Sequence, residues 1–349
     1  MTNTKTRKRK PTVAIVGVGR LGQALGIALQ SAGYPIVALV ARRRQKAEKA
    51  VALLTEARPR PIALTMNELE RLAVRSNSPT PRSLAGPVRV GMGNGDGKTH
   101  VVDLIIIATP DDAIAETVER LATGLTGDET RRRTSQSGQR AATRGTMPRA
   151  TVLHTSGALS SDVLSPLAQI GFHTGSLHPL VSVSEPRAGA RGLHGAFYCL
   201  EGDATALRIA RAIVKDLQGS SFSIRPESKA LYHAAALMAA GHITALFDLA
   251  TELLAACGLK KSQAREVLLP LVESAVRNLQ VSTPEKALTG TFARGDVATV
   301  RRHLAALSGK KHAEAFAVYK LLGLRSLQLA ASNNLDPERT KQIRKLLKR

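Results

Sequence analysis

Three glycines near the N-terminus constrain the fold of this chain more than any other feature. Gly17, Gly19 and Gly22 spell G-x-G-x-x-G after the apolar, β-branched run TVAIV and at the start of a helical pattern. In a β–turn–α unit the first glycine permits a tight turn, the second lets backbone approach a pyrophosphate, and the third lets helix and strand pack closely. The motif, with Arg20 and Leu21 between its last two glycines, predicts a dinucleotide site. The alternative is a glycine-tolerant turn that binds nothing.

The end of the second predicted strand, 35–41, indicates which dinucleotide is bound. A site for NAD places Asp or Glu there to bind the ribose 2′-hydroxyl. Here Arg42, Arg43 and Arg44 follow the strand, and no carboxylate occurs before Glu48. Guanidinium groups bind a 2′-phosphate, and cations at a helix N-terminus otherwise oppose the helix dipole. We therefore expect NADPH as the cofactor, bound through Arg42 and Arg43.

Alternating strand and helix patterns continue to about residue 225, and helices alone follow. This order predicts an α/β Rossmann-type, doubly wound parallel sheet followed by an all-α C-terminal domain. We expect a single buried strand over 101–110 and one long Ala/Leu helix from 229 to 258. The first predicted part is a basic tail, 1–10. A Rossmann domain with insertions at about 76–100 and 124–149 spans 11–225. A helical substrate and dimerisation domain spans 226–332, and a basic C-terminal helix spans 333–349.

The charge of the chain first suggests a nucleic-acid partner. Lys and Arg number 50 against 27 Asp and Glu, a formal net charge of +23. Nearly all of this excess falls in 1–10, 42–49, 131–149 and 339–349, rather than over a whole folded face. Nucleic-acid binding is therefore not expected, although a protein that used the basic tails would lose affinity steeply with salt.

Other classes of protein are also disfavoured by the sequence. The two cysteines, Cys199 and Cys257, suit a reducing cytoplasm, where we expect the protein to act. There is no run of 18 apolar residues, so no membrane span is expected. The nine histidines and two cysteines show no close metal-ligand spacing, so no metal is expected.

A second candidate for cofactor binding follows the run VVDLIII. Thr109 and Pro110 end this predicted strand, at the edge where such sheets line the cofactor crevice. Thr109 could bind the cofactor, or it could cap the helix that follows. The sequence does not distinguish these two roles.

Six segments together resemble a bacterial family of Rossmann-like NADP-dependent oxidoreductases whose C-terminal half is a domain of unknown function. They read GVGRLGQALG, IIIATPDDAI, HTSGAL, GSLHPL, KALYHAAALMAA and KALTGTFARGD, in that order along the chain. More distantly the chain is similar to pyrroline-5-carboxylate reductase, ketopantoate reductase and the 6-phosphogluconate dehydrogenase group. The resemblance implies a reductase, dimeric through its helical domain, with catalysis in the interdomain cleft. Gly241 and Thr291 depart from the family, which tends to have Asn and Pro there.

Reduction of C=O or C=N needs an acid near the receiving heteroatom, and Lys229 and His233 are candidates. Their i, i+4 spacing puts them on one helix face with Ala236 and Ala240, where small side chains leave room for a substrate. The alternative is a lysine that extends from a helix start and a histidine packed in the core. The resemblance favours the catalytic role.

Two turns hold the remaining candidates. His178, beside Pro179, could face the cleft or could bind its own turn. His154, Ser156 and Gly157 end another strand, where Ser156 could bind the carboxamide or substrate, or could simply form the turn.

A last cluster consists of Thr289, Gly290, Arg294 and Asp296. Arg294 could bind a substrate carboxylate or pair with Asp296, and Gly295-Asp296 is typical of a turn into a helix N-cap. The leading hypothesis is an NADPH-dependent reductase of a small anionic carbonyl or imine. The alternative is a non-catalytic NADP(H)-binding regulator, which the loss of Asn at Gly241 makes plausible.

Overall fold

The computed structural model describes residues 9–54, 59–75, 88–91, 99–126 and 150–348 of the 349-residue chain. The chain divides into two compact units, 1–237 and 238–349. The expected boundary near residue 225 falls before this division, because the first turns of the following helix are bonded to the sheet of the first unit. The predicted basic tail lies almost wholly outside the described residues, as does most of the second insertion.

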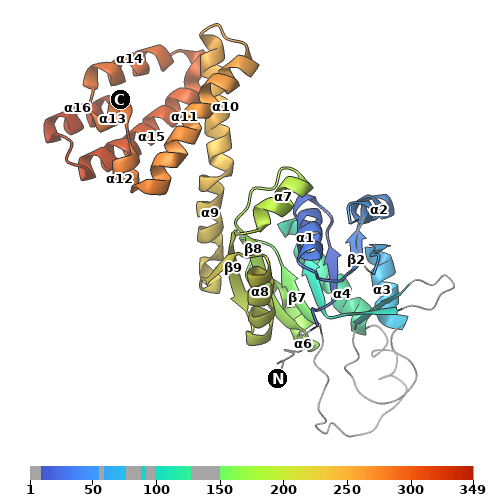
Figure 1. Ribbon diagram of the computed structural model, residues 1–349. Helices are drawn as coiled ribbons and strands as arrows, with labels where there is room; N and C mark the ends of the chain where they lie inside the picture. Colours follow the sequence, from blue (N-terminus) through green and yellow to red (C-terminus); the bar gives the residue numbers. More distant parts are fainter. Residues whose placement is uncertain (1–8, 55–58, 76–87, 92–98, 127–149, 349) are drawn as a thin grey trace, which may run out of the picture. The chain divides into compact units, whose positions relative to one another are not determined.

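An eight-stranded sheet organises the first unit (Figure 1). Its spatial order is β10-β9-β8-β7-β6-β1-β2-β3, and all neighbours are parallel except β8 and β9. This confirms the Rossmann-type fold class and departs from a wholly parallel sheet at that one pair. The strands are β1 (Val13–Val16), β2 (Ile36–Ala41), β3 (Ile62–Thr65), β6 (Leu104–Ile107), β7 (Thr151–His154), β8 (His173–Pro179), β9 (Phe197–Gly202) and β10 (Ser220–Ser223).

Helices cover both faces of this sheet, which explains why its central strands are continuously apolar. In β1, Val13 and Ile15 pack against helices on one face, whereas Ala14 and Val16 pack on the other. The first face carries α1 (Arg20–Ser31), α2 (Arg44–Ala52), α7 (Pro186–Leu193) and α8 (Ala204–Asp216). The second carries α3 (Met66–Arg75), α4 (Asp111–Thr126), the 3₁₀ turn η1 (Ser161–Leu164) and α6 (Ser165–Gln169).

The predicted strand over 101–110 is two strands in the structure. Thr99–Val102 forms β5, which pairs antiparallel with β4 (Val88–Gly91) as a separate hairpin. The chain then turns at Asp103, whose carboxylate accepts hydrogen bonds from the backbone N–H and the hydroxyl of Thr12, at 2.9 Å each. Only Leu104–Ile107 enters the main sheet. The hairpin lies mostly within the first predicted insertion, at about 76–100.

The predicted long helix over 229–258 is also interrupted. After the 3₁₀ turn η2 (Pro226–Ser228), α9 (Lys229–Ala239) and α10 (Gly241–Ala256) are separated at Ala240, whose φ of −129° and ψ of −71° are not helical. Gly241 begins α10, and glycine weakens a helix at such a point because it gains the most conformational freedom outside it. The departure from the family at Gly241 therefore coincides with a break in the helix.

The second unit is helical from α10 onward. Its small buried cluster is Val300, Leu327, Ile343 and Leu347. Asp296 caps α14 by accepting a hydrogen bond from Thr299 N–H at 3.0 Å, which confirms the predicted N-cap. The remaining elements are α11 (Lys261–Val281), α12 (Pro284–Ala287), α13 (Gly290–Ala293), α14 (Val297–Leu307), the 3₁₀ turn η3 (Lys310–His312), α15 (Ala313–Ser332) and α16 (Pro337–Lys348).

One helical stretch of the described chain, Pro226–Ala256, is long and apolar enough to cross a membrane by length and composition alone. Core helices of water-soluble proteins pass the same test. Lys229, within its first helical turn, hydrogen-bonds to the sheet of the first unit. One such stretch is weak evidence of a membrane span.

Candidate active site

The glycine turn has the geometry that its sequence predicts. Gly17 has a φ of +99°, and a Cβ there would lie 2.6 Å from the Ala108 carbonyl carbon and the Thr109 nitrogen. A Cβ on Gly22 would lie 1.9 Å from the Gly17 oxygen, whereas one on Gly19 would meet nothing within 4 Å. The first and third glycines thus permit close packing. The second leaves open space at the N-terminus of α1, where a pyrophosphate can approach backbone N–H groups.

The residues around this turn fit a phosphorylated dinucleotide. Arg20 is exposed at the first position of α1, and Leu21 packs partly against the core. Arg42 and Arg43 are exposed after β2, which pairs with β1. Arg44, in contrast, binds the carboxylates of Glu48 and Glu68.

Thr109 does not cap the next helix. Its hydroxyl oxygen is buried and has no hydrogen-bond partner among the residues that the structure describes, and α4 begins only at Asp111. A buried hydroxyl without a partner is costly, so it favours a ligand group here. Pro110 follows it and is exposed.

A polar cluster lies beyond Thr109 along the sheet, where β7, β8 and β9 meet α9. Ser176 and His178 alternate with Leu177 on β8, so both lie on one face of the sheet. Cys199 and Glu201 lie directly opposite them on β9. His154, at the end of β7, is the register partner of Ser176.

Lys229 is the centre of this cluster. Its side chain is 1% exposed, and its Nζ donates hydrogen bonds to the Ser156 carbonyl at 3.1 Å and to the Ser176 hydroxyl at 2.8 Å. Burial lowers the pKa of this ammonium, while Cys199, Glu201 and Asp111 act in the opposite direction. The lysine therefore does not extend from the helix into solvent, as its structural alternative required.

Ser156 contributes its backbone more than its hydroxyl. The hydroxyl oxygen accepts hydrogen bonds from the N–H groups of Ala158 and Leu159, at 3.1 and 3.0 Å. It thus forms the turn, while the Ser156 carbonyl holds Lys229. A contact of its hydroxyl with substrate remains a prediction.

His154 is buried and neutral in a defined tautomer. Burial and the nearby Lys229 ammonium lower its pKa to about 3. Its Nε2 lies 3.1 Å from the Ser160 carbonyl, and its Nδ1 accepts a hydrogen bond from Ser156 N–H at 3.2 Å. A carbonyl can only accept, so Nε2 carries the hydrogen.

His178 and His233 converge on Gly157. A Cβ at Gly157 would lie 2.3 Å from His233 Nδ1 and 2.8 Å from His178 Nε2. The His178 Nδ1 is 2.6 Å from the Tyr232 hydroxyl, so the ring is held by α9 and does not bind its own turn. Burial, Lys229 and His233 lower the pKa of His178 to about 4. His233 Nδ1 is buried without a partner within the described chain.

The structure adds four residues that the sequence analysis did not select: Ser176, Cys199, Glu201 and Tyr232. The alternation of polar and apolar residues in GSLHP and FYCLEG was a signal for the first three. Tyr232 lies three residues after Lys229, on the same helix face. Thr289, Arg294 and Asp296 belong to the other unit, and a role of Arg294 in substrate binding remains a prediction.

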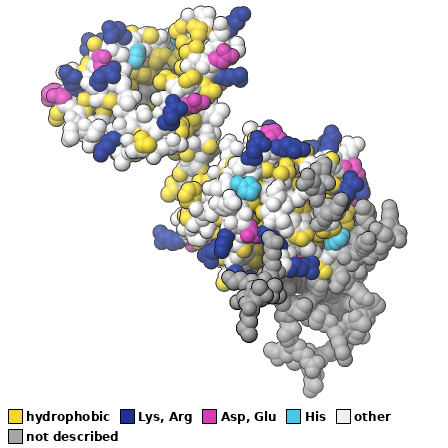
Figure 2. All heavy atoms as spheres, in the orientation of Figure 1, with side chains coloured by type: hydrophobic (Ala, Val, Ile, Leu, Met, Phe, Trp, Pro, Cys, Tyr) yellow, Lys and Arg dark blue, Asp and Glu magenta, His cyan; other side chains and the backbone are white. Residues whose placement is uncertain are grey.

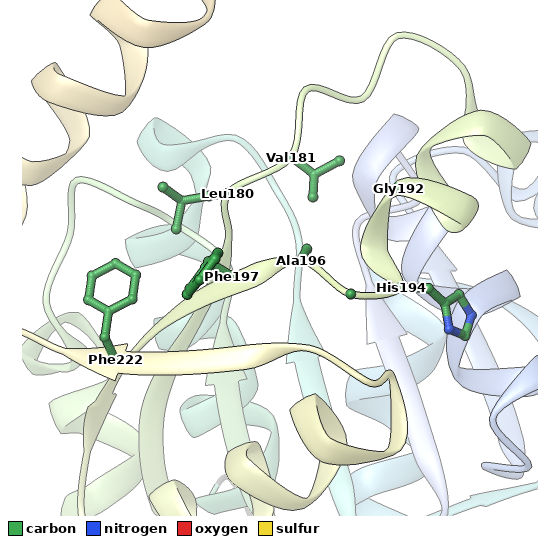
Figure 3. A pocket seen from close by; sticks show the side chains of 8 residues that line it. Leu180, Val181, Gly192, His194, Ala196, Phe197 and Phe222 are labelled. Atoms are coloured by element: carbon green, nitrogen blue, oxygen red, sulfur yellow. The ribbon is translucent and has the colours of Figure 1, made fainter. Parts of the chain in front are cut away.

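A shallow apolar pocket of about 590 Å³ opens beside this cluster (Figure 3). Leu180, Phe197 and Phe222 line one end, and His194 lies at the other. The Phe222 ring contacts Tyr232, with 5.8 Å between ring centroids. None of the predicted catalytic residues lines the pocket.

Comparisons with known proteins agree with this architecture. The family model described as Domain of unknown function (DUF2520) matches residues 196–326. No curated protein is significantly similar. A candidate NADP oxidoreductase from Bacteroides fragilis is 19% identical with a TM-score of 0.64, and the alignment covers 92% of this chain and 99% of that chain.

Two reductases have the same overall fold. The 1-pyrroline-5-carboxylate reductase of Streptococcus pyogenes is 14% identical, with a TM-score of 0.52 and coverage of 98% and 100%. The pyrroline carboxylate reductase of Plasmodium falciparum, solved with NADP bound, is 10% identical, with a TM-score of 0.50 and coverage of 96% and 98%. The chain is thus a Rossmann-like protein with a helical C-terminal region. Its residues 196–326 match the model of a domain of unknown function, in agreement with the resemblance seen in the sequence.

The low pKa values of His154 and His178 predict a loss of stability in mild acid. In the unfolded chain both histidines become protonated as the pH falls below the ordinary pKa of 6.5. In the folded chain His154 stays neutral down to about pH 3 and His178 down to about pH 4. The free energy of unfolding should therefore fall as the pH drops from 6.5 to 4, as measured by urea unfolding. His154→Asn should make this fall shallower, whereas the exposed-ring control His194→Asn should not. Equal slopes for His154→Asn and the wild type would contradict this assignment.

Proposed function

We propose that the protein is an NADPH-dependent reductase of a small anionic carbonyl or imine substrate. The observation that carries the proposal is the buried Lys229 ammonium at the carboxyl edge of the sheet that also holds the glycine turn. Neighbouring parallel strands β7, β6, β1 and β2 are followed there by Ser156, Thr109, Gly17 and Arg42. Carboxyl ends of parallel strands are where such folds bind dinucleotide and substrate.

The residues present fit the cofactor that the fold implies. The open space at Gly19 suits the pyrophosphate, Arg42 and Arg43 suit a 2′-phosphate, and the orphaned Thr109 hydroxyl suits a polar group of the bound ligand. Bound NADPH would supply the hydride. The similarity to reductases, one of which was solved with NADP bound, supports the same assignment.

Lys229 is the proposed proton donor. An ammonium has three hydrogens, and the Ser156 carbonyl and the Ser176 hydroxyl accept two of them. The third is left for the substrate heteroatom that gains a proton during reduction. Burial lowers the lysine pKa, which makes it a stronger acid near neutral pH. The cationic group also favours an anionic substrate.

Replacement of Lys229 tests this role. Lys229→Met retains most of the side-chain volume but removes the proton, so kcat should fall by about 10²- to 10⁴-fold, the range for a general acid. The NADPH dissociation constant should change little. Stopped-flow NADPH oxidation with a panel of 2-keto acids and cyclic imines gives both quantities, and Lys215→Met, exposed on α8, is the control.

Two results would contradict the proposal. Unaltered turnover in Lys229→Met would remove this residue from the mechanism. Tight NADPH binding by the wild type, without turnover of any carbonyl or imine in the panel, would favour a non-catalytic NADP(H)-binding regulator instead.

The cofactor assignment has its own test. Arg42→Ala combined with Arg43→Ala should weaken NADPH binding at least about 10-fold, because even one hydrogen bond to a charged group contributes about 1.5–3 kcal/mol. NADH affinity should change far less, since NADH lacks the 2′-phosphate. Fluorescence titration measures both. Arg44→Ala is the matched control because that guanidinium already binds Glu48 and Glu68. Equal weakening of NADPH and NADH would refute the role of the two arginines.

The helical unit further supports a homodimer. Large apolar side chains are exposed on it, among them Leu271 at 67%, Val281 at 83% and Leu321 at 70%, while its buried cluster is small. Hydrophobic surface on these helices is visible in Figure 2. Large apolar side chains gathered in exposed positions mark an interaction surface, and a second copy would cover it.

Light scattering should therefore give twice the chain mass of 37.1 kDa. Leu271→Asp should shift the protein toward the monomer, because a charge in an apolar interface is costly to desolvate. The exposed Phe197→Asp in the first unit is the control. A monomeric wild type at micromolar concentration would rule out this interface.

A further inference from the structure

The His178 ring is held between two fixed groups of the first unit. Its Nδ1 is 2.6 Å from the Tyr232 hydroxyl, and the two rings meet edge to face at 88° with centroids 5.5 Å apart. Its Nε2 faces Gly157, where an added Cβ would lie 2.8 Å away. The two ring nitrogens therefore have different surroundings, one enclosed by protein and the other beside the glycine.

The charge state of His178 limits what each nitrogen can do. Burial disfavours a charged imidazolium most, Lys229 and His233 from α9 act in the same direction, and together they lower the pKa of His178 to about 4. His154 on β7 and both Cys199 and Glu201 on β9 are further titratable residues on this face of the sheet. At neutral pH the ring is therefore uncharged and carries one hydrogen, on either Nδ1 or Nε2.

The hydrogen bond with Tyr232 favours one of these two tautomers. A phenol is a good hydrogen-bond donor and a poor acceptor, while an unprotonated imidazole nitrogen is a good acceptor. The Cys199 thiol also contacts the Tyr232 hydroxyl, but a thiol is a weak acceptor and competes poorly for the phenol hydrogen. The favoured arrangement is a Tyr232 O–H that donates to Nδ1, which leaves the hydrogen of His178 on Nε2.

We propose that Tyr232 is a positioning residue that fixes His178 as the Nε2–H tautomer, and that this N–H donates to a carbonyl or carboxylate oxygen of the substrate. No hydrogen bond within the described residues occupies Nε2, so it is available to a ligand. The oxygen acceptor rests on the proposed reductase function, whereas the tautomer does not depend on that function.

In this arrangement His178 and Lys229 have different roles. The neutral Nε2–H can orient an oxygen acceptor without competing with Lys229 for the same proton, because a neutral imidazole is a far weaker acid than an ammonium. It cannot favour a protonated imine nitrogen, which has no lone pair to accept with. His178 therefore selects the oxygen-bearing end of the substrate, and Lys229 supplies the proton.

Nitrogen-15 NMR of the histidine side chains tests the tautomer without a substrate. The wild type should show a pyridine-type Nδ1 and a pyrrole-type Nε2 for His178, assigned by the loss of this signal in His178→Gln. Tyr232→Phe removes the phenol hydrogen and should give a mixture of both tautomers. The control is Tyr198→Phe, because Tyr198 is fully buried, whereas Tyr232 is half-buried, and donates its hydroxyl to the Leu193 carbonyl instead of to a histidine.

A wild-type spectrum with the hydrogen on Nδ1 would overturn the proposal. An identical His178 pattern in Tyr232→Phe and the wild type would do the same. Because these spectra need no turnover, they decide the tautomer even if the proposed reductase activity fails. Loss of folding in Tyr232→Phe is checked by comparing its urea unfolding with that of Tyr198→Phe.

Kinetics test the contact with substrate. With a 2-keto acid, Tyr232→Phe should lower kcat/KM about 2- to 10-fold, the effect of one net hydrogen bond. His178→Gln, whose amide can still donate, should retain more activity than His178→Ala, and neither should alter NADPH affinity. Equal activity of the two His178 variants would overturn the role of the N–H donor.

Discussion

The candidate site depends on one buried cation. The Lys229 ammonium is nearly inaccessible to solvent and donates to the Ser156 carbonyl and the Ser176 hydroxyl. Burial of an ammonium is costly unless its hydrogens find acceptors, so these bonds hold the start of α9 against β7 and β8. The same bonds bring Tyr232 and His233 to the sheet, because they follow one helical turn later on the same face. Removal of either acceptor would leave a buried charge underbonded.

The parallel sheet provides the other half of this arrangement. Its central strands are buried on both faces, so their polar ends can only emerge at the edges. The glycine turn after β1, Thr109 after β6 and the Ser156 turn after β7 consequently meet at the same edge. The antiparallel β9 adds Cys199 and Glu201 opposite His178 and Ser176. Close packing of Gly17 against Ala108 explains why the turn tolerates no larger side chain there.

Several elements show where local sequence patterns were sufficient and where they failed. The glycine turn and the cap at Asp296 follow from backbone geometry within a few residues, and both were predicted correctly. The prediction of one strand over 101–110 was wrong because the chain turns at Asp103, which bonds to Thr12, a residue distant in sequence. The prediction of one long helix over 229–258 was wrong because the apolar pattern gives no sign of the non-helical backbone at Ala240.

The sequence by itself determined the class of fold, the glycine turn and the residue types at the edge of the sheet. Periodicity and turn chemistry act over short stretches of chain, so they are legible without the structure. Only the tertiary structure decided which of these residues act together. It paired Arg44 with Glu48 and Glu68 and left Arg42 and Arg43 exposed, and it made the Ser156 carbonyl the partner of Lys229. It also joined Tyr232 to His178, because hydrogen bonds and desolvation depend on distances between strands and helices that sequence separation does not encode.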